Sequence, residues 1–86
     1  MQETEKILKA LANRRRLTIL KLLSNNSKSS VGYIAKEIKL SFKATSKHLG
    51  ILLNAGILER EQVNLLMYYS LIRPTSSIVR SVVGRL

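Results

Sequence analysis

The sequence predicts a small, mainly α-helical domain with one β-hairpin near its C-terminal end. Apolar residues recur at helical spacing over most of the first 55 positions. The period then changes to strand-like alternation between residues 57 and 71. A proline at position 74 closes that region, and helical spacing returns after it.

Length and composition indicate one folded domain, residues 1–86, with an anionic partner. The 86 residues are 45% hydrophobic, which is too apolar for a disordered basic tail. Fifteen Lys and Arg against five Asp and Glu give a formal net charge of +10. A surplus of this size favours nucleic acid first and an anionic membrane surface second.

Several classes of site and location are disfavoured by what the sequence lacks. It has no cysteine, which removes disulfides, thiolate metal sites and cysteine nucleophiles. No apolar run reaches the ~18 residues of a membrane span, and the acidic, polar N-terminus does not resemble a signal peptide. We therefore expect a cytoplasmic protein. One histidine and five scattered carboxylates form no catalytic constellation, so we do not expect an enzyme.

Two helices are expected in the first third of the chain. The first begins close to the N-terminus, and its apolar stripe consists of Ile7, Leu8 and Leu11. A break at residues 12–13 separates it from a second helix over residues 14–23. Leucine and isoleucine surround most of that second helix, so we expect it to be central and buried.

Three arginines stand at the start of the second helix, where cations oppose the helix dipole. The cost is ~0.3–1 kcal/mol for each exposed cation. A broken local rule can mark a functional site, so Arg14 and Arg15 are candidate phosphate contacts. The alternative is that they are simply solvated, or that they pair with Glu3 and Glu5.

The next two helices have the spacing of a helix-turn-helix. A loop rich in Ser and Asn over residues 24–29 precedes a short helix over residues 31–38. A tight turn leads into a longer helix over residues 41–55, which Ser41 is suited to cap and Gly56 to end. Two short helices joined in this way, with the second basic on its outer face, are typical of DNA-binding helix-turn-helix units.

The longer helix has an apolar back and a small, polar, cationic front. Thr45, Leu49 and Leu52 fall on the back, and Lys43 and Lys47 fall on the front. This front suits a DNA major groove, because it has no carboxylate to repel phosphate and its side chains can hydrogen-bond base edges or phosphates. The alternative is an ordinary solvated helix face.

After Gly56 the pattern changes to a hairpin. Residues 57–62 and 65–71 are strand-like, and Val63–Asn64 fits the tip because Asn tolerates a positive φ. Arg60 is the main cation of this hairpin and has a glutamate on each side. The tip is apolar: it can insert in a minor groove, contact another protein or lie exposed, and the sequence favours none of these.

The last helix, after Pro74, is short and rich in β-branched residues, so it needs packing to be stable. The first and last helices together hold more apolar surface than one small domain covers. A second copy would bury it, so we expect a twofold homodimer; the alternative is packing within one chain. The expected interface residues are Ile7, Leu8, Leu11, Ile78, Val79, Val82 and Leu86.

The order helix, helix, helix-turn-helix, hairpin, helix is that of a winged helix-turn-helix. Residues 11–23 (LANRRRLTILKLL) resemble the leucine-rich second-helix motif of ArsR-type bacterial and archaeal repressors. The recognition helix and wing of that family are similar to residues 46–49 (SKHL), 55–58 (AGIL) and 69–71 (YSL). The resemblance covers nearly the whole chain.

The resemblance implies a dimeric transcription regulator, a repressor, that reads a palindromic operator in double-stranded DNA. Its recognition helices would enter successive major grooves, and its hairpins would lie along the flanking backbone or minor groove. Phe42 can touch a thymine methyl or pack on its own domain, and we favour packing. The candidate DNA contacts, including those carried over by position, are Arg14, Arg15, Ser41, Phe42, Lys43, Thr45, Ser46, Lys47, His48 and Arg60.

Many members of that family sense metals through cysteines or through clusters of His and Asp, and this sequence lacks such ligand sets. His48 belongs to the recognition-helix motif, where a phosphate contact or helix packing is favoured over metal. We therefore expect no metal and no cofactor, and the sequence names no effector. Two other functions stay open: a non-specific architectural DNA-binding protein, and a winged helix used for contact with another protein.

Overall fold

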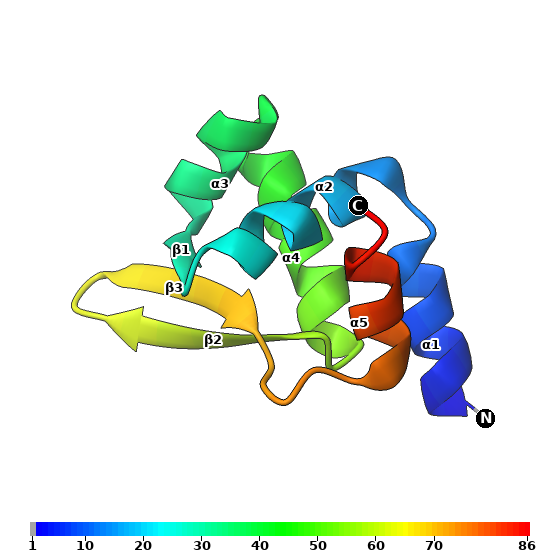
Figure 1. The fold of residues 1–86 in the computed structure, drawn as a ribbon. Coiled ribbons are helices and arrows are strands. Elements are labelled where there is room, and N and C mark those ends of the chain that lie inside the picture. The colour runs from blue at the N-terminus through cyan, green and yellow to red at the C-terminus, as the bar shows by residue number, and fades with distance from the viewer. Residues whose placement is uncertain (1) are drawn as a thin grey trace.

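Five helices and a small antiparallel sheet make up residues 2–86, the part of the chain that the computed structural model describes (Figure 1). In chain order the elements are α1 (Gln2–Leu11), α2 (Arg14–Asn25), β1 (Ser29–Ser30), α3 (Val31–Ile38), α4 (Phe42–Asn54), β2 (Leu58–Val63), β3 (Leu66–Leu71) and α5 (Ser77–Val83). This order confirms the predicted winged helix-turn-helix. None of these helices is both long enough and apolar enough to cross a membrane.

Short polar side chains begin four of the helices. Serine hydroxyls at positions 30, 41 and 76 each accept a hydrogen bond from the amide three residues later, at 3.1–3.3 Å. Asn13 caps α2 in the same way, because its Oδ1 accepts the Arg16 amide at 3.1 Å. At the other end of α4, Gly56 has a φ of +75°, a conformation that glycine adopts without steric cost. Local side-chain chemistry therefore sets most helix boundaries.

The turn between α3 and α4 is tight although it has no glycine. Lys39 adopts the left-handed conformation instead, with a φ of 57°. The amide of Leu40 closes the turn by donating to the carbonyl of Ala35 at 3.0 Å, and the half-buried Leu40 side chain packs against the core. These contacts offset the strain at Lys39 and fix the angle at which α4 leaves α3.

The strands β2 and β3 form the predicted hairpin, which we call the wing (residues 58–71). They pair antiparallel from Leu58 opposite Leu71 to the outer end of the hairpin. The tip is Asn64–Leu65, one residue later than predicted, and Asn64 supplies the positive φ of 59°. The wing projects from one side of the helical body, and α1 and α5 occupy the opposite side (Figure 1).

The sheet has a third strand, β1, where the sequence predicted only a loop. Ser29 lies opposite Tyr69 and Ser30 lies opposite Tyr68, so the order in the sheet is β1-β3-β2. A strand of two residues has no recognisable period, which explains why it was missed. The pairing ties the root of the wing to the start of α3.

The core lies where α2, α3, α4 and the root of the wing meet. Ile19, Leu20 and Leu23 of α2 are fully buried, so α2 is the central helix as predicted. Leu49 and Leu52 on the back of α4 are buried against the same cluster. The back of α4 is thus fixed by packing, and its front is left for a partner.

Candidate nucleic-acid interface

The outer face of α4 carries the expected cations. Lys43 and Lys47 are exposed one helical turn apart, and Ser46 is half-buried on the same face. Gly50 continues this face one turn further, and apart from its chain neighbours and the backbone of its own helix no atom lies within 4 Å of the position that a Cβ there would take. The helix contains no carboxylate. The front of α4 is therefore a cationic surface with small residues at Ser46 and Gly50, and it lies on a helix whose back packs in the core.

Thr45 does not belong to this front, which corrects the expectation that it contacts DNA. Its side chain is 0% exposed, and its Oγ1 has no hydrogen-bond partner. Helical periodicity had placed Thr45 on the apolar back, whereas the family resemblance had included it among the candidate DNA contacts. The periodicity was the better guide, because a residue four positions before the buried Leu49 must share its environment.

Phe42 and Ser41 stand at the start of α4. Phe42 is 62% exposed, so the preference for packing on its own domain is wrong. The Ser41 hydroxyl accepts the Ala44 amide at 3.1 Å and is itself exposed to solvent. Its primary role is to cap the helix, and its proton remains available to a phosphate oxygen.

Arg16, which the sequence analysis did not single out, holds α4 from behind. Its Nη1 donates to Nδ1 of His48 at 3.2 Å, and its Nε donates to the Ala10 carbonyl at 2.6 Å. Its Nη2 reaches the Lys9 carbonyl at 3.3 Å. One guanidinium at the start of α2 therefore joins the end of α1 to the middle of the recognition helix. No sequence signal could show this contact, because 32 residues separate Arg16 from His48.

His48 takes part in this contact as a neutral ring. A guanidinium can only donate, so Nδ1 of His48 must accept. Burial lowers the pKa of His48 below its ordinary value of 6.5, and the nearby charges of Arg16, Arg15 and Lys47 lower it further. The half-buried ring is thus occupied in positioning α4, which is the helix-packing alternative for this residue.

Arg14 and Arg15 are both exposed near the same end of α2. Nη1 of Arg15 donates to the Ile38 carbonyl at 3.2 Å, at the C-terminal end of α3, where a helix dipole favours a cation. Within residues 2–86 no ion pair joins either arginine to Glu3 or Glu5; Glu5 pairs with a lysine of its own helix instead. For Arg15, the unfavourable interaction of its charge with the dipole of α2 is therefore offset by a favourable interaction with the dipole of α3.

Arg60 is the cation of the wing and lies exposed on β2. The neighbouring Glu61 is engaged by Lys28, whose Nζ lies 3.1 Å from its carboxylate and 5.6 Å from the centre of the Tyr68 ring. This pairing, which also joins distant parts of the sequence, reduces the negative charge beside Arg60. Glu59 remains exposed on its other side.

The predicted self-association surface divides into two groups. Leu11 and Val79 are buried in the core of their own chain, so they cannot lie in an interface. Leu8 is 51% exposed and Leu86 is 42% exposed. The residues that remain available on α1 and after Pro74 are Ile7, Leu8, Ile78, Val82 and Leu86.

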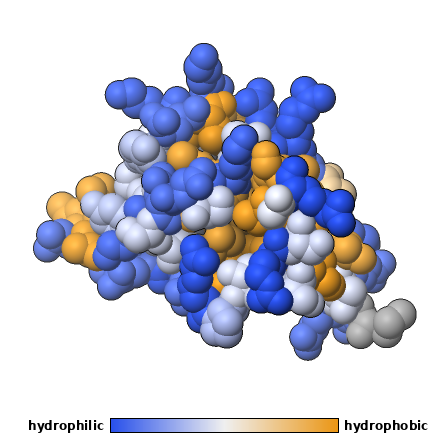
Figure 2. Space-filling model, viewed as in Figure 1, coloured by the Kyte–Doolittle hydropathy of each residue, from blue (hydrophilic) through white to orange (hydrophobic). Residues whose placement is uncertain are grey.

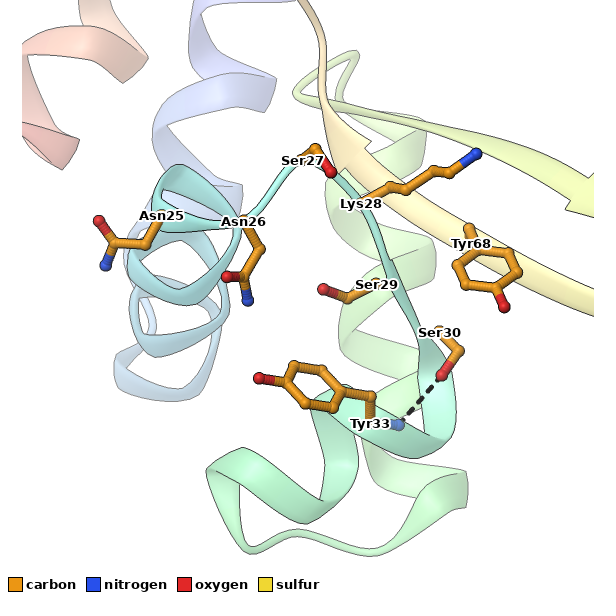
Figure 3. A pocket seen from close by; sticks show the side chains of 8 residues that line it. All are labelled: Asn25, Asn26, Ser27, Lys28, Ser29, Ser30, Tyr33 and Tyr68. Carbon is orange, nitrogen blue, oxygen red and sulfur yellow. Dashed lines mark hydrogen bonds between the residues drawn. The ribbon is translucent and has the colours of Figure 1, made fainter.

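A polar hollow of about 520 Å³ lies between the end of α2, β1 and β3 (Figure 3). Amides, hydroxyls and two tyrosine rings line it, and its lysine, Lys28, is engaged by Glu61. The hollow therefore presents hydrogen-bonding groups without a free charge. No cluster of three or more His, Asp or Glu side chains in residues 2–86 has the spacing to hold a metal ion.

Comparison with known proteins points in the same direction as this geometry. Residues 13–60 match the family described as "Bacterial regulatory protein, arsR family". The transcriptional activator HlyU of Vibrio cholerae is 37% identical, and the match covers 83% of this chain and 71% of HlyU.

Solved structures extend the similarity to the whole fold. HlyU from Vibrio cholerae superposes with a TM-score of 0.82 at 32% identity, covering 98% of this chain and 87% of HlyU. The homodimeric winged helix-turn-helix DNA-binding domain of a Mycobacterium bovis protein gives 0.83 at 27% identity, with 98% and 74% covered. The transcriptional repressor PagR of Bacillus anthracis gives 0.82 at 26% identity, with 98% and 92% covered.

Proposed function

Since the chain belongs to the arsR family of bacterial regulatory proteins, and is thus a transcriptional regulator with a DNA-binding winged helix-turn-helix rather than an enzyme, we propose that it is a sequence-specific repressor that binds DNA as a homodimer. The observation that carries this proposal is the exposed, carboxylate-free front of α4. Its proposed location is the cytoplasm, with the DNA.

The front of α4 supplies the reading contacts. A major groove about 12 Å wide admits an α-helix, and the back of α4 is occupied by its own core. Lys43 and Lys47 can donate to guanine O6 and N7 or to phosphate oxygens, and the Ser46 hydroxyl can donate or accept at a base edge. Because Gly50 has no side chain and the space around it is open, the helix backbone can come close to the groove there.

Other cations supply the contacts that position the domain on the duplex. Arg14, Arg15 and Arg60 are exposed and can pair with phosphates, which fix register without carrying sequence information. Each phosphate neutralised adds about −0.9 to the slope of log affinity against log salt. Binding should therefore weaken steeply as salt is raised.

The dimer is proposed from the apolar surface left on the terminal helices and from the homodimeric Mycobacterium bovis relative. Leu8 of α1 and Leu86, which follows α5, expose large apolar side chains. The helices α1 and α5 lie on the side of the molecule away from the wing (Figure 1). A twofold pair would present two copies of α4, and half-sites one helical turn apart would be about 34–36 Å from centre to centre.

Repression is proposed because a bound dimer can block transcription by occupancy alone. PagR is called a repressor and HlyU an activator, so these two relatives do not decide between repression and activation. Transcription in vitro from a promoter that overlaps the selected site separates them. The proposal expects less transcript as the protein saturates its site; more transcript would establish activation instead.

Selection of bound sequences from random duplex DNA tests the function. The proposal expects enrichment of a palindromic site, and weaker selection by Lys43→Ala and Lys47→Ala. Lys21→Ala, an exposed lysine of α2 outside this face, is the matched control and should select normally. Duplex binding without any enriched sequence would indicate an architectural protein, and no binding at low salt would indicate a protein-contact domain.

A further inference from the structure

The tip of the wing is apolar and uncharged. Leu65 is 94% exposed, and its neighbours Val63 and Leu66 are exposed as well. No Lys, Arg, Asp or Glu occurs between residues 62 and 72. Figure 2 shows apolar atoms at the end of the molecule where, in the same view, the wing projects in Figure 1. One exposed leucine is ordinary, but a cluster on a projecting hairpin indicates a contact surface.

This apolar surface continues to the start of the recognition helix. A hollow of about 300 Å³ separates the wing tip from α4, and Phe42, Leu65, Leu66 and Met67 are among the residues that line it. Phe42 is immediately followed by Lys43, the first cation of the proposed reading face. The wing tip thus borders the same face that we propose for DNA.

The tip is held in a defined conformation. Asn64 adopts a φ of 59°, and Nε2 of Gln62 donates to its carbonyl at 3.2 Å. The strands on either side pair continuously up to the last residue before the turn. Leu65 is therefore held at the end of a regular hairpin, on a defined turn.

We infer that Leu65 enters the minor groove beside the site read by α4 and packs there against deoxyribose rings and base edges. This inference rests on the proposed function. An uncharged tip gains nothing from phosphate, whereas leucine and other apolar side chains are used as non-ionic contacts in minor grooves. The wing of this chain thus anchors by apolar packing, and Arg60 alone provides its phosphate contact.

Three variants at one position separate apolar from ionic contact: Leu65→Met, Leu65→Ser and Leu65→Lys. At 94% exposure the side chain contributes little to folding, so all three should fold normally. Affinity for the selected site is measured over a salt series. Leu65→Met should bind like the wild type. Leu65→Ser should bind about tenfold more weakly with an unchanged salt slope, because no phosphate contact is lost. Leu65→Lys should steepen the slope.

The groove itself is tested with DNA in which 2,6-diaminopurine replaces adenine in the flanks. This base adds an amino group to the minor groove and leaves the major-groove edge unchanged. Wild-type protein should bind the substituted site more weakly, and Leu65→Ser should bind both sites equally.

The outcomes distinguish this inference from the function on which it rests. If the wild type binds no duplex at low salt, the proposed function fails. If the wild type binds selectively but Leu65→Ser binds just as well, or Leu65→Lys leaves the salt slope unchanged, the tip is not in the DNA and is free for a protein partner. An equal response of wild type and Leu65→Ser to diaminopurine would also overturn the minor-groove contact.

Discussion

Replacing Arg16 with methionine removes the guanidinium that joins three helices and keeps most of the apolar length of the side chain. The variant loses hydrogen bonds to the Ala10 carbonyl at 2.6 Å, the His48 ring at 3.2 Å and the Lys9 carbonyl at 3.3 Å. The Lys9 bond is exposed, so water can replace it. The loss therefore comes from the other two bonds, which are part-buried and have a charged donor; at the low end of about 1.5–3 kcal/mol each, they give a loss of about 3 kcal/mol in the free energy of unfolding.

Urea unfolding followed by circular dichroism measures this loss as a lower midpoint at unchanged m-value. In a domain of this size, roughly 4–8 °C of melting temperature accompanies each kcal/mol. His48→Ala provides the second arm of a double-mutant cycle, and we expect Arg16→Met and His48→Ala to be non-additive because they share one hydrogen bond. A loss below about 0.5 kcal/mol, or full additivity of the two changes, would show that Arg16 is merely a solvated charge and would refute the anchoring of α4.

Three further predictions concern other parts of the molecule. Thr45→Val replaces a buried hydroxyl without a partner by a methyl group of similar shape, so it should raise the free energy of unfolding by about 1 kcal/mol, and a lower melting temperature would contradict this. The folded pKa of His48 is depressed, so the unfolded chain binds the proton more readily. The contribution of neutral His48 to the free energy of unfolding is therefore present above pH 6.5 and is lost as the pH falls through the folded pKa. A series of urea midpoints at different pH values should show this loss for the wild type and not for His48→Gln. Leu8→Glu should weaken self-association at least ~100-fold by burying two unpaired carboxylates, as measured by sedimentation, and an unchanged dimer would place the interface elsewhere.

Features that depend on nearby residues were predictable from the sequence. The cap at Ser41, the glycine that ends α4 and the hairpin before Pro74 are set by interactions within a few residues, and each was predicted to within a residue or two. The cationic front of α4 also follows from local periodicity. These features are sufficient to define the fold and to locate the proposed reading face.

Features that depend on distant residues were not predictable. Arg16 meets His48, and Lys28 meets Glu61, across more than 30 residues each, and no periodic pattern encodes such pairs. Val79 was assigned to the dimer because a stripe of valines and isoleucines does not show which of its members the core takes. The strand β1 was missed for a related reason, since it forms only because β3 lies beside it.

Reading of base sequence by the front of α4 is the proposal on which the others depend. The most direct measurement is the ratio of the dissociation constants for random duplex and for the selected site, determined at one salt concentration. For the wild type we predict a ratio of at least ~10³, within the range of specific recognition. The Ser46→Ala/Lys47→Ala variant should bring the ratio close to one while retaining most of the random-duplex binding. A wild-type ratio near one, or a variant that discriminates as well as the wild type, would contradict the account.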